Sequence, residues 1–450
     1  MQCILTIAGS DSGGGAGIEA DLKTFAALGM HGACAITSVT AQNTLGVERV
    51  YDLPEDVIVD QIRAVTSDIR VDYVKIGMLS SERIVRTVAG EIEGIPFVLD
   101  PVMSAEAGGS LLAEDALDAL VSVLIPLASV VTPNVYEAFA ITGIRIRSIE
   151  DAKRAAAAIA TLGCRAAVIT GGHLDGTDVL CESSNGVIDS TRLIRGSGGL
   201  IKGGTHGAGC TYSAALASYL AKGLSVSDAC AAAKVFVEKA IANSSRIGRG
   251  VAPVNQTLEV TSDAARYHAI TDISAAVKAI EGSESFGSLI PEVGCNIGSA
   301  IPAAQSAGDV AAVRGRIVTV GGGRARAVVC AEFGASSHIA RLILAVMQFD
   351  PMMRSAMNIR YSDAVISACE ECGYTVASFD RRDEPPHQKT MDWGAEYAIK
   401  RAGYVPQVIW DAGGVGKEAM VRILGGSAVE VADLAIRVAE CEPLKTPICT

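Results

Sequence analysis

Residues 4–28 read ILTIAGSDSGGGAGIEADLKTFAAL and decide the fold that we predict for the first half of the chain. Ile4–Ala8 is a short apolar run typical of a buried strand, and a glycine-rich loop follows it. Apolar residues then recur at helical spacing over Ile18–Leu28, and Gly29 ends the pattern. A strand, a glycine loop and a helix form the opening of an α/β unit. The loop fits neither the dinucleotide-binding nor the P-loop spacing, so we expect its bare backbone to approach a small ligand.

The same alternation of strand and helix continues along the chain. Polar residues or glycines follow the strands, which predicts a three-layer α/β domain with a mostly parallel sheet and helices on both faces. The further strands that we expect are Ala33–Val39, Tyr73–Ile76, Phe97–Leu99, Ser129–Val131 and Ala166–Ile169. The helices between them are expected at Pro54–Val65, Glu82–Ala89, Leu112–Leu124 and Val135–Ile141.

Ligands on such a sheet bind beyond the carboxyl ends of its parallel strands. The residues that we expect along this edge are Gly9, Gln42, Met78, Asp100, Asn134 and Gly171. A hairpin of Val179–Ser183 and Val187–Arg195 then leads the chain to residues 203–211, which read GGTHGAGCT. Helices over Thr211–Lys222 and Ser227–Asn243 complete the unit.

The stretch 203–211 is where we expect the chemistry of the first domain. Backbone N–H groups at a helix start can close around an anion, and each donor aimed at a phosphoryl group in flight stabilises it by roughly 3 kcal/mol. Cys210 is the polar group placed to take the proton of an acceptor hydroxyl. A helix N-terminus lowers the thiol pKa from about 8.5, so we expect partial thiolate at neutral pH. The alternative is a tight turn with a buried cysteine.

Two carboxyl groups are candidates for a metal site in the same domain. Asp100 and Glu137 have the oxygen ligands that Mg²⁺ prefers, and we expect them to hold the ion together with nucleotide phosphates. The alternatives are that Asn134 caps a helix or turn and that Glu137 is solvated.

Composition and charge exclude several classes of protein. The chain has 450 residues, of which 49% are hydrophobic and 20% charged, which predicts two or three well-packed domains. A net charge of −12 argues against nucleic-acid or anionic-membrane partners. We expect no signal peptide and no membrane span. The 12 cysteines are scattered, and Cys369 and Cys372 are expected to be helix-surface or core thiols rather than zinc ligands. This pattern suggests a reducing cytoplasm.

The composition and the pattern of the sequence change in its second half. Gly248–His268 has no clear period, and we place the domain boundary inside it. Beyond about Ile273, arginines recur beside glycines, and a pair of serines precedes a helix expected over Ile339–Gln348. We therefore expect a second, smaller α/β domain with several anion-competent loops.

Seven motifs in the first domain together resemble a known family. They are Ala8–Asp11 with Gly14–Thr24, Thr40–Thr44, Lys75–Leu79, Asp100–Met103, Thr132–Asn134 with Glu137, Gly171–His173 and Thr205–Thr211. They resemble hydroxymethylpyrimidine/phosphomethylpyrimidine kinase, a ribokinase-superfamily enzyme of thiamine biosynthesis that phosphorylates a pyrimidine alcohol and then its monophosphate with ATP. The resemblance implies a ribokinase-like kinase domain over residues 1–255, followed by a linker over 256–272.

The resemblance also implies roles for single residues. It places Gly9, Gln42 and Met78 at the pyrimidine, with Val102 nearby, and Cys210 in the position of the catalytic base. A Gln42 amide can both donate to and accept from an aminopyrimidine edge. The anion hole is assigned to Gly207 and Gly209, and the nucleotide site to Asn134, Glu137, Gly171, Gly172 and Thr205.

Two positions depart from the family pattern. Thr170 stands where the family usually has lysine, so one charged phosphate contact is missing or comes from elsewhere. Ser12-Gly13 replaces the usual Pro-Ser and loosens the first loop.

The second domain, over residues 273–440, resembles the archaeal-type thiamine-phosphate synthase. The motifs that carry the resemblance are Gly315–Val318, Glu332–His338, Asn358–Tyr361, Ser378–Arg382, Trp393-Gly394 and Gly413–Glu418. This implies coupling of the pyrimidine diphosphate to a thiazole phosphate with release of pyrophosphate. Catalysis is expected from Arg316 and His338, and substrate binding from Ser336, Ser337, Arg360 and Arg381. The alternative for His338 is a helix-capping role.

Two other functions stay open at this point. The first domain could phosphorylate another vitamer of the pyridoxal type, although Gln42 and Met78 favour the pyrimidine. The second domain could be a non-catalytic sensor of thiamine phosphate, although the chain shows no basic helix-turn-helix motif. For the bifunctional enzyme we expect ATP and Mg²⁺ as cofactors, small-molecule partners and a homodimer in the cytoplasm.

Overall fold

The computed structural model describes residues 1–103, 114–172, 174–196, 201, 203–302, 304–385, 390–414 and 416–441. The chain divides into two compact units, Met1–Val260 and Thr261–Thr450. The α-helix α9 spans Leu258–Gly282 and so covers most of the stretch expected to be a linker. Its buried residues are Ala269, Ile273, Ala276 and Ile280. The buried residues with helical spacing begin only at Ala269. The first half of the helix therefore has no apolar periodicity from which a helix could be predicted.

The described strands of the first unit form one sheet, in the order β3-β2-β1-β4-β5-β6-β7-β8-β9. From β2 to β7 neighbouring strands run parallel, whereas β3, β8 and β9 pair antiparallel. The strands are β1 Cys3–Asp11, β2 His31–Asn43, β3 Gly46–Asp52, β4 Tyr73–Ile76, β5 Phe97–Leu99, β6 Val130–Val131, β7 Ala166–Ile169, β8 Thr177–Ser184 and β9 Val187–Arg195.

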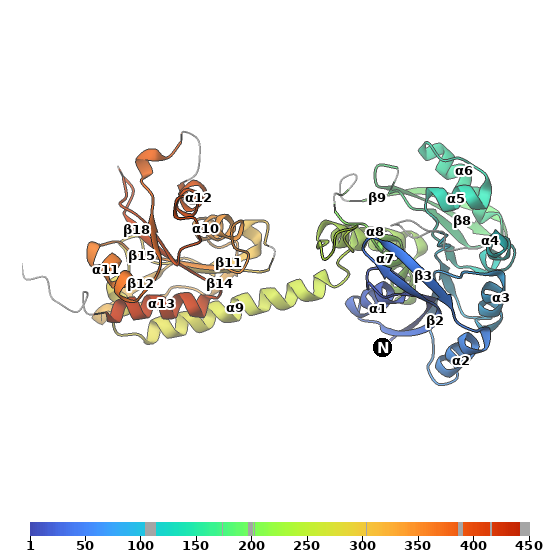
Figure 1. Cartoon of the computed structure of the whole chain (residues 1–450), viewed down its shortest axis with the longest axis horizontal. Helices are drawn as coiled ribbons and strands as arrows, with labels where there is room; N and C mark the ends of the chain where they lie inside the picture. Colours follow the sequence, from blue (N-terminus) through green and yellow to red (C-terminus); the bar gives the residue numbers. More distant parts are fainter. Residues whose placement is uncertain are drawn as a thin grey trace, which may run out of the picture. The chain divides into compact units, whose positions relative to one another are not determined.

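Helices cover both faces of this sheet, as Figure 1 shows. One layer contains α1 (Gly17–Ala27), α7 (Ala208–Ala221) and α8 (Val226–Ala242), which share a core with one face of the strands. The other layer contains α2 Glu55–Thr66, α3 Glu82–Glu91, α4 Glu114–Ala119, α5 Val135–Thr142 and α6 Ile149–Ala160. The predicted three-layer arrangement with a mostly parallel sheet is therefore confirmed.

Some elements differ from the expectation. β3 and α6 were not predicted; β3 is mostly exposed and extends β2 as a hairpin, so its residues lack a buried face that alternates. The helix expected over Leu112–Leu124 begins outside the described residues and changes after Ala119 into a π-helical turn over Leu120–Leu124. Pro126 follows in a 3-10 turn, and since proline has no N–H it cannot continue an α-helical ladder.

The second unit is also α/β, but its sheet is mostly antiparallel. Its order is β14-β11-β10-β15-β18-β17-β16, and β12 pairs with β13 separately. The strands are β10 Ile297–Ala300, β11 Val310–Val313, β12 Ile317–Val320, β13 Arg324–Ala327, β14 Ala331–Phe333, β15 Ser355–Arg360, β16 Val376–Ser378, β17 Val408–Asp411 and β18 Met420–Gly425. The further helices are α10 Ser337–Met347, α11 Asp363–Glu371, α12 Thr390–Ala402 and α13 Ala428–Glu440.

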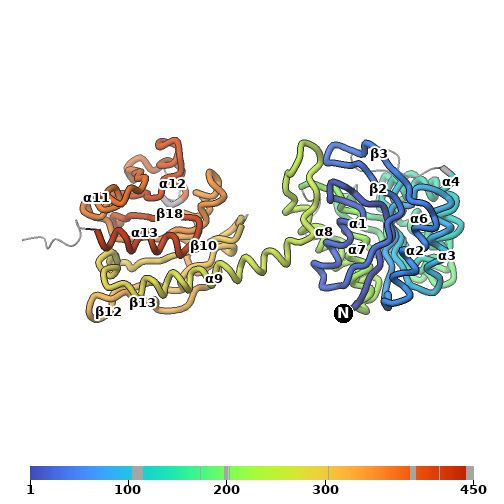
Figure 2. The backbone as a smooth tube through the Cα atoms, turned by 60° about the horizontal axis from the view of Figure 1, so that its bottom comes forward, coloured from blue at the N-terminus to red at the C-terminus, as the bar shows by residue number. Residues whose placement is uncertain are grey.

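Alternation along the strands gives this sheet two cores. Met357 and Ile359 of β15 face α9, α11 and α13, whereas Ala356 faces α10 and α12. Figure 2 shows α13 lying beside α9, and the Asp272 carboxylate of α9 accepts hydrogen bonds from the first amides of α13. In the described part of the chain, no helix is both long and apolar enough to span a membrane.

Candidate active sites

A cavity of about 980 Å³ lies at the carboxyl ends of the parallel strands of the first unit. The predicted site residues that line it are Gly9, Gln42, Met78, Asp100, Val102, Asn134, Glu137, Gly172, Thr205, Gly207, Gly209 and Cys210. Gly171 does not line it, contrary to expectation. The Gly171 N–H instead donates to the buried Asp178 carboxylate at 2.6 Å, and a Cβ at Gly171 would lie 2.1 Å from the Thr177 carbonyl oxygen. His173 lies outside the described residues.

The start of α7 forms one wall of the cavity. Gly207 is the N-cap at a φ of 82°, and a Cβ there would lie 1.9 Å from the carbonyl oxygen of Gly15. Only glycine therefore allows this approach. The first hydrogen bond of the α7 ladder runs from Thr211 N–H to the Gly207 carbonyl, so the amides of Gly209 and Cys210 lack helical partners. They are available to an anion in the cavity.

The expected partial thiolate of Cys210 is wrong for this environment. Cys210 is only half-buried, but the surrounding protein desolvates the thiol, and the carboxylates of Asp100 and Asp21 repel a negative charge. These effects outweigh the nearby Lys75 ammonium and the helix N-terminus, and they raise the pKa of Cys210 to about 12. The sequence shows the helix start but not the two acids that lie beside it.

The two predicted metal ligands lie close enough to influence each other. Burial and the charge of Asp100 raise the pKa of Glu137 to about 8. The Ser213 hydroxyl donates to Asp100 at 2.9 Å. Asn134 does cap α5, since its side chain accepts from Tyr136 and Glu137 N–H, and Glu137 is buried rather than solvated. Among described residues, no group of three or more acidic, histidine or cysteine side chains is arranged to hold a metal.

Lys75 was not predicted as a site residue, although it lines the cavity. The Lys75 ammonium is fully buried and donates to Asp21 at 2.9 Å, and the same Asp21 oxygen accepts from Thr6. Burial disfavours the ammonium, but the charges of Asp21 and Asp100 raise the pKa of Lys75 overall. A Cβ at Gly77 would lie 2.9 Å from the Lys75 nitrogen, so this glycine leaves room for the charge. A lysine inside a buried apolar strand is the sequence signal for such a pair.

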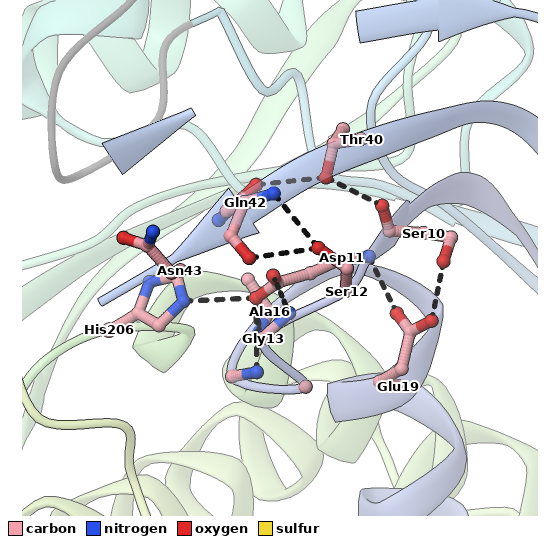
Figure 3. Close-up of polar contacts among 12 residues, drawn as sticks. Ser10, Asp11, Ser12, Gly13, Ala16, Glu19, Thr40, Gln42, Asn43 and His206 are labelled. Carbon is pink, nitrogen blue, oxygen red and sulfur yellow. Dashed lines mark hydrogen bonds and ion pairs between the residues drawn. The ribbon is translucent and has the colours of Figure 1, made fainter. Parts of the chain in front are cut away.

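The side chain of Gln42 lies on the opposite wall, at the end of β2. Its amide oxygen is 3.3 Å from the Thr40 hydroxyl, and its backbone pairs with the Ser12 hydroxyl, as Figure 3 shows. Gly9 lies close to Met78, since a Cβ at Gly9 would lie 3.1 Å from the Met78 sulfur. Gln42, Gly9 and Met78 are thus brought together as predicted.

A positively charged side chain, that of Lys234, lines the end of the cavity far from Gln42. Thr170 lines the same cavity. Lys234 of α8 is almost fully buried and donates to Asp178 at 2.9 Å. The same Asp178 oxygen accepts the Gly171 N–H, so the pair also holds the turn after β7. Lys234 was not predicted as a site residue.

In the second unit, the predicted arginines come from one edge of the sheet. Arg316 follows β11, Arg360 ends β15 and Arg381 follows β16, and the strand register places these ends together. The pKa of His338 is lowered, chiefly because the imidazole is partly buried. Four nearby positive charges lower it further: Arg341, Arg316, Arg422 and Arg381. Arg360 is exposed and is not among the arginines that act on His338.

His338 does not cap α10. The N-cap is Ser336, whose hydroxyl accepts from Ile339 N–H, and Ser337 is the first helical residue. This leaves His338 exposed in the first helical turn, with its Nδ1 3.5 Å from Arg341. The structure therefore brings the helix start, the histidine and several guanidinium groups together.

One carboxylate organises two of these arginines. Asp411, at the end of β17, is fully buried and pairs with both Arg381 and Arg422. Arg422 is also buried, and its guanidinium lies 5.4 Å from the centre of the Phe379 ring. Two positive charges share one negative charge, so the cluster keeps a net positive charge. Asp411 and Arg422 were missed because nothing in the sequence shows that their strands are neighbours.

Comparison with known proteins places both units. Residues 11–255 match the phosphomethylpyrimidine kinase family, and residues 272–437 match thiamine-phosphate synthase ThiN. The chain belongs to the phosphomethylpyrimidine kinase family. It is 33% identical over 432 residues to the bifunctional thiamine biosynthesis protein ThiDN of Methanocaldococcus jannaschii, covering 95% of this chain and 96% of that protein.

Relatives of the first unit alone support this family membership. A hydroxymethylpyrimidine/phosphomethylpyrimidine kinase of Streptomyces coelicolor is 46% identical over 257 residues, which is 56% of this chain and 93% of the relative. The ADP complex of Bacillus subtilis pyridoxal kinase is 36% identical with a TM-score of 0.52, and the match covers 58% of this chain and 99% of that one. The first unit is therefore a ribokinase-like kinase domain, and the chain is a bifunctional transferase of thiamine biosynthesis.

The stability of the kinase domain should depend on the buried Lys75–Asp21 ion pair. We expect Lys75→Met to destabilise it by about 3–5 kcal/mol, because a buried carboxylate loses its partner. Lys75→Met combined with Asp21→Asn removes both charges and should recover most of that loss. Urea unfolding followed by circular dichroism measures this. Fluorescence of Trp393 and Trp410, which both lie in the second unit, serves as the internal control.

A matched pair of substitutions tests the Asp411 cluster. We expect Asp411→Asn to lower the midpoint of the tryptophan-detected unfolding transition and to reduce thiamine-phosphate synthesis at least about tenfold, because two buried guanidiniums lose their counter-ion. The control is Asp380→Asn, whose partner Arg382 is exposed, and it should change stability by about 1 kcal/mol or less. Equal effects of the two substitutions would contradict the proposed importance of Asp411.

Proposed function

We propose that the first unit phosphorylates 4-amino-5-hydroxymethyl-2-methylpyrimidine and then its monophosphate with ATP, and that the second unit couples the diphosphate to thiazole phosphate. The observation that carries the kinase step is the cavity, in which Gln42, Gly9 and Met78 face the start of α7. An amide that donates and accepts suits an aminopyrimidine edge, and unpartnered amides suit a phosphoryl group.

Phosphoryl transfer needs positioning and charge stabilisation more than covalent chemistry. The amides of Gly209 and Cys210 would stabilise the charge of the phosphoryl group in flight, with Gly207 keeping the helix start open. The proton of the attacking hydroxyl would pass to the Cys210 sulfur. Because the pKa of that thiol is raised to about 12, thiolate is scarce at neutral pH, but it is a correspondingly strong base.

The nucleotide would lie toward Asn134, Gly172 and Thr205, which line the far part of the cavity. Lys234 offers the positive charge that Thr170 does not. Asp100 and Glu137 fit Mg²⁺ as a pair of buried carboxyl groups, since the ion commonly takes one or two carboxylates together with phosphate oxygens. Glu137 would have to lose its proton when the cation binds. The ion would neutralise charge on the phosphates.

The second unit would bind the pyrimidine diphosphate and the thiazole phosphate at its arginine-rich edge. Arg316 and Arg381 would hold the departing pyrophosphate, and the neutral His338 imidazole can still donate one N–H to it. Ser336 and Ser337 would offer the start of α10 to a phosphate, and we keep Arg360 as a further phosphate contact. We also propose a cytoplasmic homodimer, which sedimentation velocity tests for the oligomeric state.

One incubation tests the whole proposal. The full-length protein is given hydroxymethylpyrimidine, thiazole phosphate, ATP and Mg²⁺, and we expect thiamine phosphate and pyrophosphate. Diphosphorylated pyrimidine that accumulates alone would show that the second unit is not a synthase. Pyridoxal in place of the pyrimidine is the control for the other kinase activity, and preferential ATP use with pyridoxal would contradict the assignment of the first unit.

The two phosphorylations should depend differently on Cys210. A monophosphate has its second pKa near about 6 and is already mostly dianionic at neutral pH, so it needs no base. We therefore expect Cys210→Ala to lower kcat of the first phosphorylation by about 100-fold and that of the second by less than tenfold. Rapid-quench measurement of each product checks this. Equal losses in both steps would show that Cys210 is not the base.

The raised pKa of Cys210 also gives a pH dependence with a definite sign. A thiol with a pKa of about 12 gains thiolate as the pH rises, so the first phosphorylation should accelerate between about pH 6 and 9. The second phosphorylation should change little above about pH 7, where the monophosphate is already mostly dianionic. A first step that is independent of pH over this range would contradict the thiolate mechanism.

A further inference from the structure

A buried hydrogen-bonded pair joins two loops of the kinase domain that are far apart in the sequence. Asp11 ends β1, and His206 precedes the start of α7, 195 residues later. The His206 Nε2 atom lies 3.0 Å from an Asp11 carboxylate oxygen, and both side chains are at most 6% exposed (Figure 3). Neither residue has a role in the mechanism described above.

Asp11 organises the glycine loop that follows it. One carboxylate oxygen accepts from Gly13 N–H, and the other accepts from Gly15 and Ala16 N–H as well as lying next to His206. Burial alone would raise the pKa of Asp11, but the hydrogen bonds from His206 and the backbone lower it overall. Asp11 is therefore a carboxylate at neutral pH.

The same loop is attached to the pyrimidine-reading wall on its other side. The Ser12 hydroxyl donates to the Gln42 carbonyl oxygen and accepts from Gln42 N–H. The Thr40 hydroxyl donates to the Ser10 carbonyl oxygen. Residues 10–16 thus lie between Gln42 and His206, and both attachments are visible in Figure 3.

Close backbone packing transmits a displacement from one loop to the other. A Cβ at Gly15 would lie 2.2 Å from the His206 ring, and a Cβ at Gly207 would lie 1.9 Å from the Gly15 carbonyl oxygen. These groups are in direct van der Waals contact. A shift of the His206 ring would therefore move Gly15 and the α7 N-cap together.

We propose that the Asp11–His206 pair is a positioning device that holds the pyrimidine-reading wall in register with the phosphoryl-binding start of α7. This rests on the proposed kinase function of the cavity. His206 acts through the loops and takes no proton from the substrate, so it serves both phosphorylations equally. In this it differs from Cys210, which serves the first.

The test compares His206→Ala, His206→Gln and the control His31→Ala, whose side chain is exposed at the start of β2. Misplacement of reacting groups by about 1 Å costs about 100-fold in rate, so His206→Ala should lower kcat of both phosphorylations by about 10- to 100-fold and by the same factor. Binding of the pyrimidine and of ADP, measured by calorimetry, should weaken less than about threefold. His206→Gln keeps a donor for Asp11 and should restore most of the rate.

A double substitution separates the pair from a general loss of packing. If the two side chains act as a unit, Asp11→Asn combined with His206→Ala should lose no more activity than Asp11→Asn alone. Additive losses, or a His206→Gln protein as slow as His206→Ala, would overturn the proposal. So would unequal losses in the two phosphorylations. A wild-type protein that does not phosphorylate the pyrimidine would instead contradict the proposed function itself, before any variant is compared.

Discussion

Direct contact of backbone with backbone is the constraint on which the kinase site depends. The α7 N-cap Gly207 and the carbonyl of Gly15 approach so closely that no Cβ fits between them. This contact brings the start of α7 against the loop after β1, so the first amides of α7 lie at the same cavity as Gly9, Gln42 and Met78. Glycine is needed here because any side chain would collide with the Gly15 carbonyl, and the proposed anion binding depends on that close approach.

Two buried pairs of polar side chains lie near this contact. Lys75 and Asp21 form a buried ion pair, and Asp11 and His206 form a buried hydrogen-bonded pair. Each pair joins elements that come from different parts of the chain and so helps to hold the cavity walls together. Desolvation, together with the charges of Asp100 and Asp21, explains why Cys210 stays a thiol where a helix start alone would favour thiolate.

The candidate site of the second unit is instead rich in positively charged side chains. In an acidic chain, its sheet edge gathers guanidinium groups around the start of α10, and one buried aspartate holds two of them. The excess positive charge suits phosphate and pyrophosphate groups. In the proposed mechanism, the kinase domain therefore uses chiefly backbone amides near its reacting groups, whereas the synthase domain uses side chains.

The sequence by itself determined the fold class and most of the cavity wall. Strand, glycine loop and helix alternate visibly, and because parallel strands end at one edge, Gln42, Met78 and Asp100 could be placed together in advance. Only the tertiary structure decided which charges meet: Lys75 pairs with Asp21 across 54 residues, and Asp411 selects two arginines. The physical reason is that periodicity reports the buried face of one element, whereas a partner or a pKa depends on which elements lie side by side.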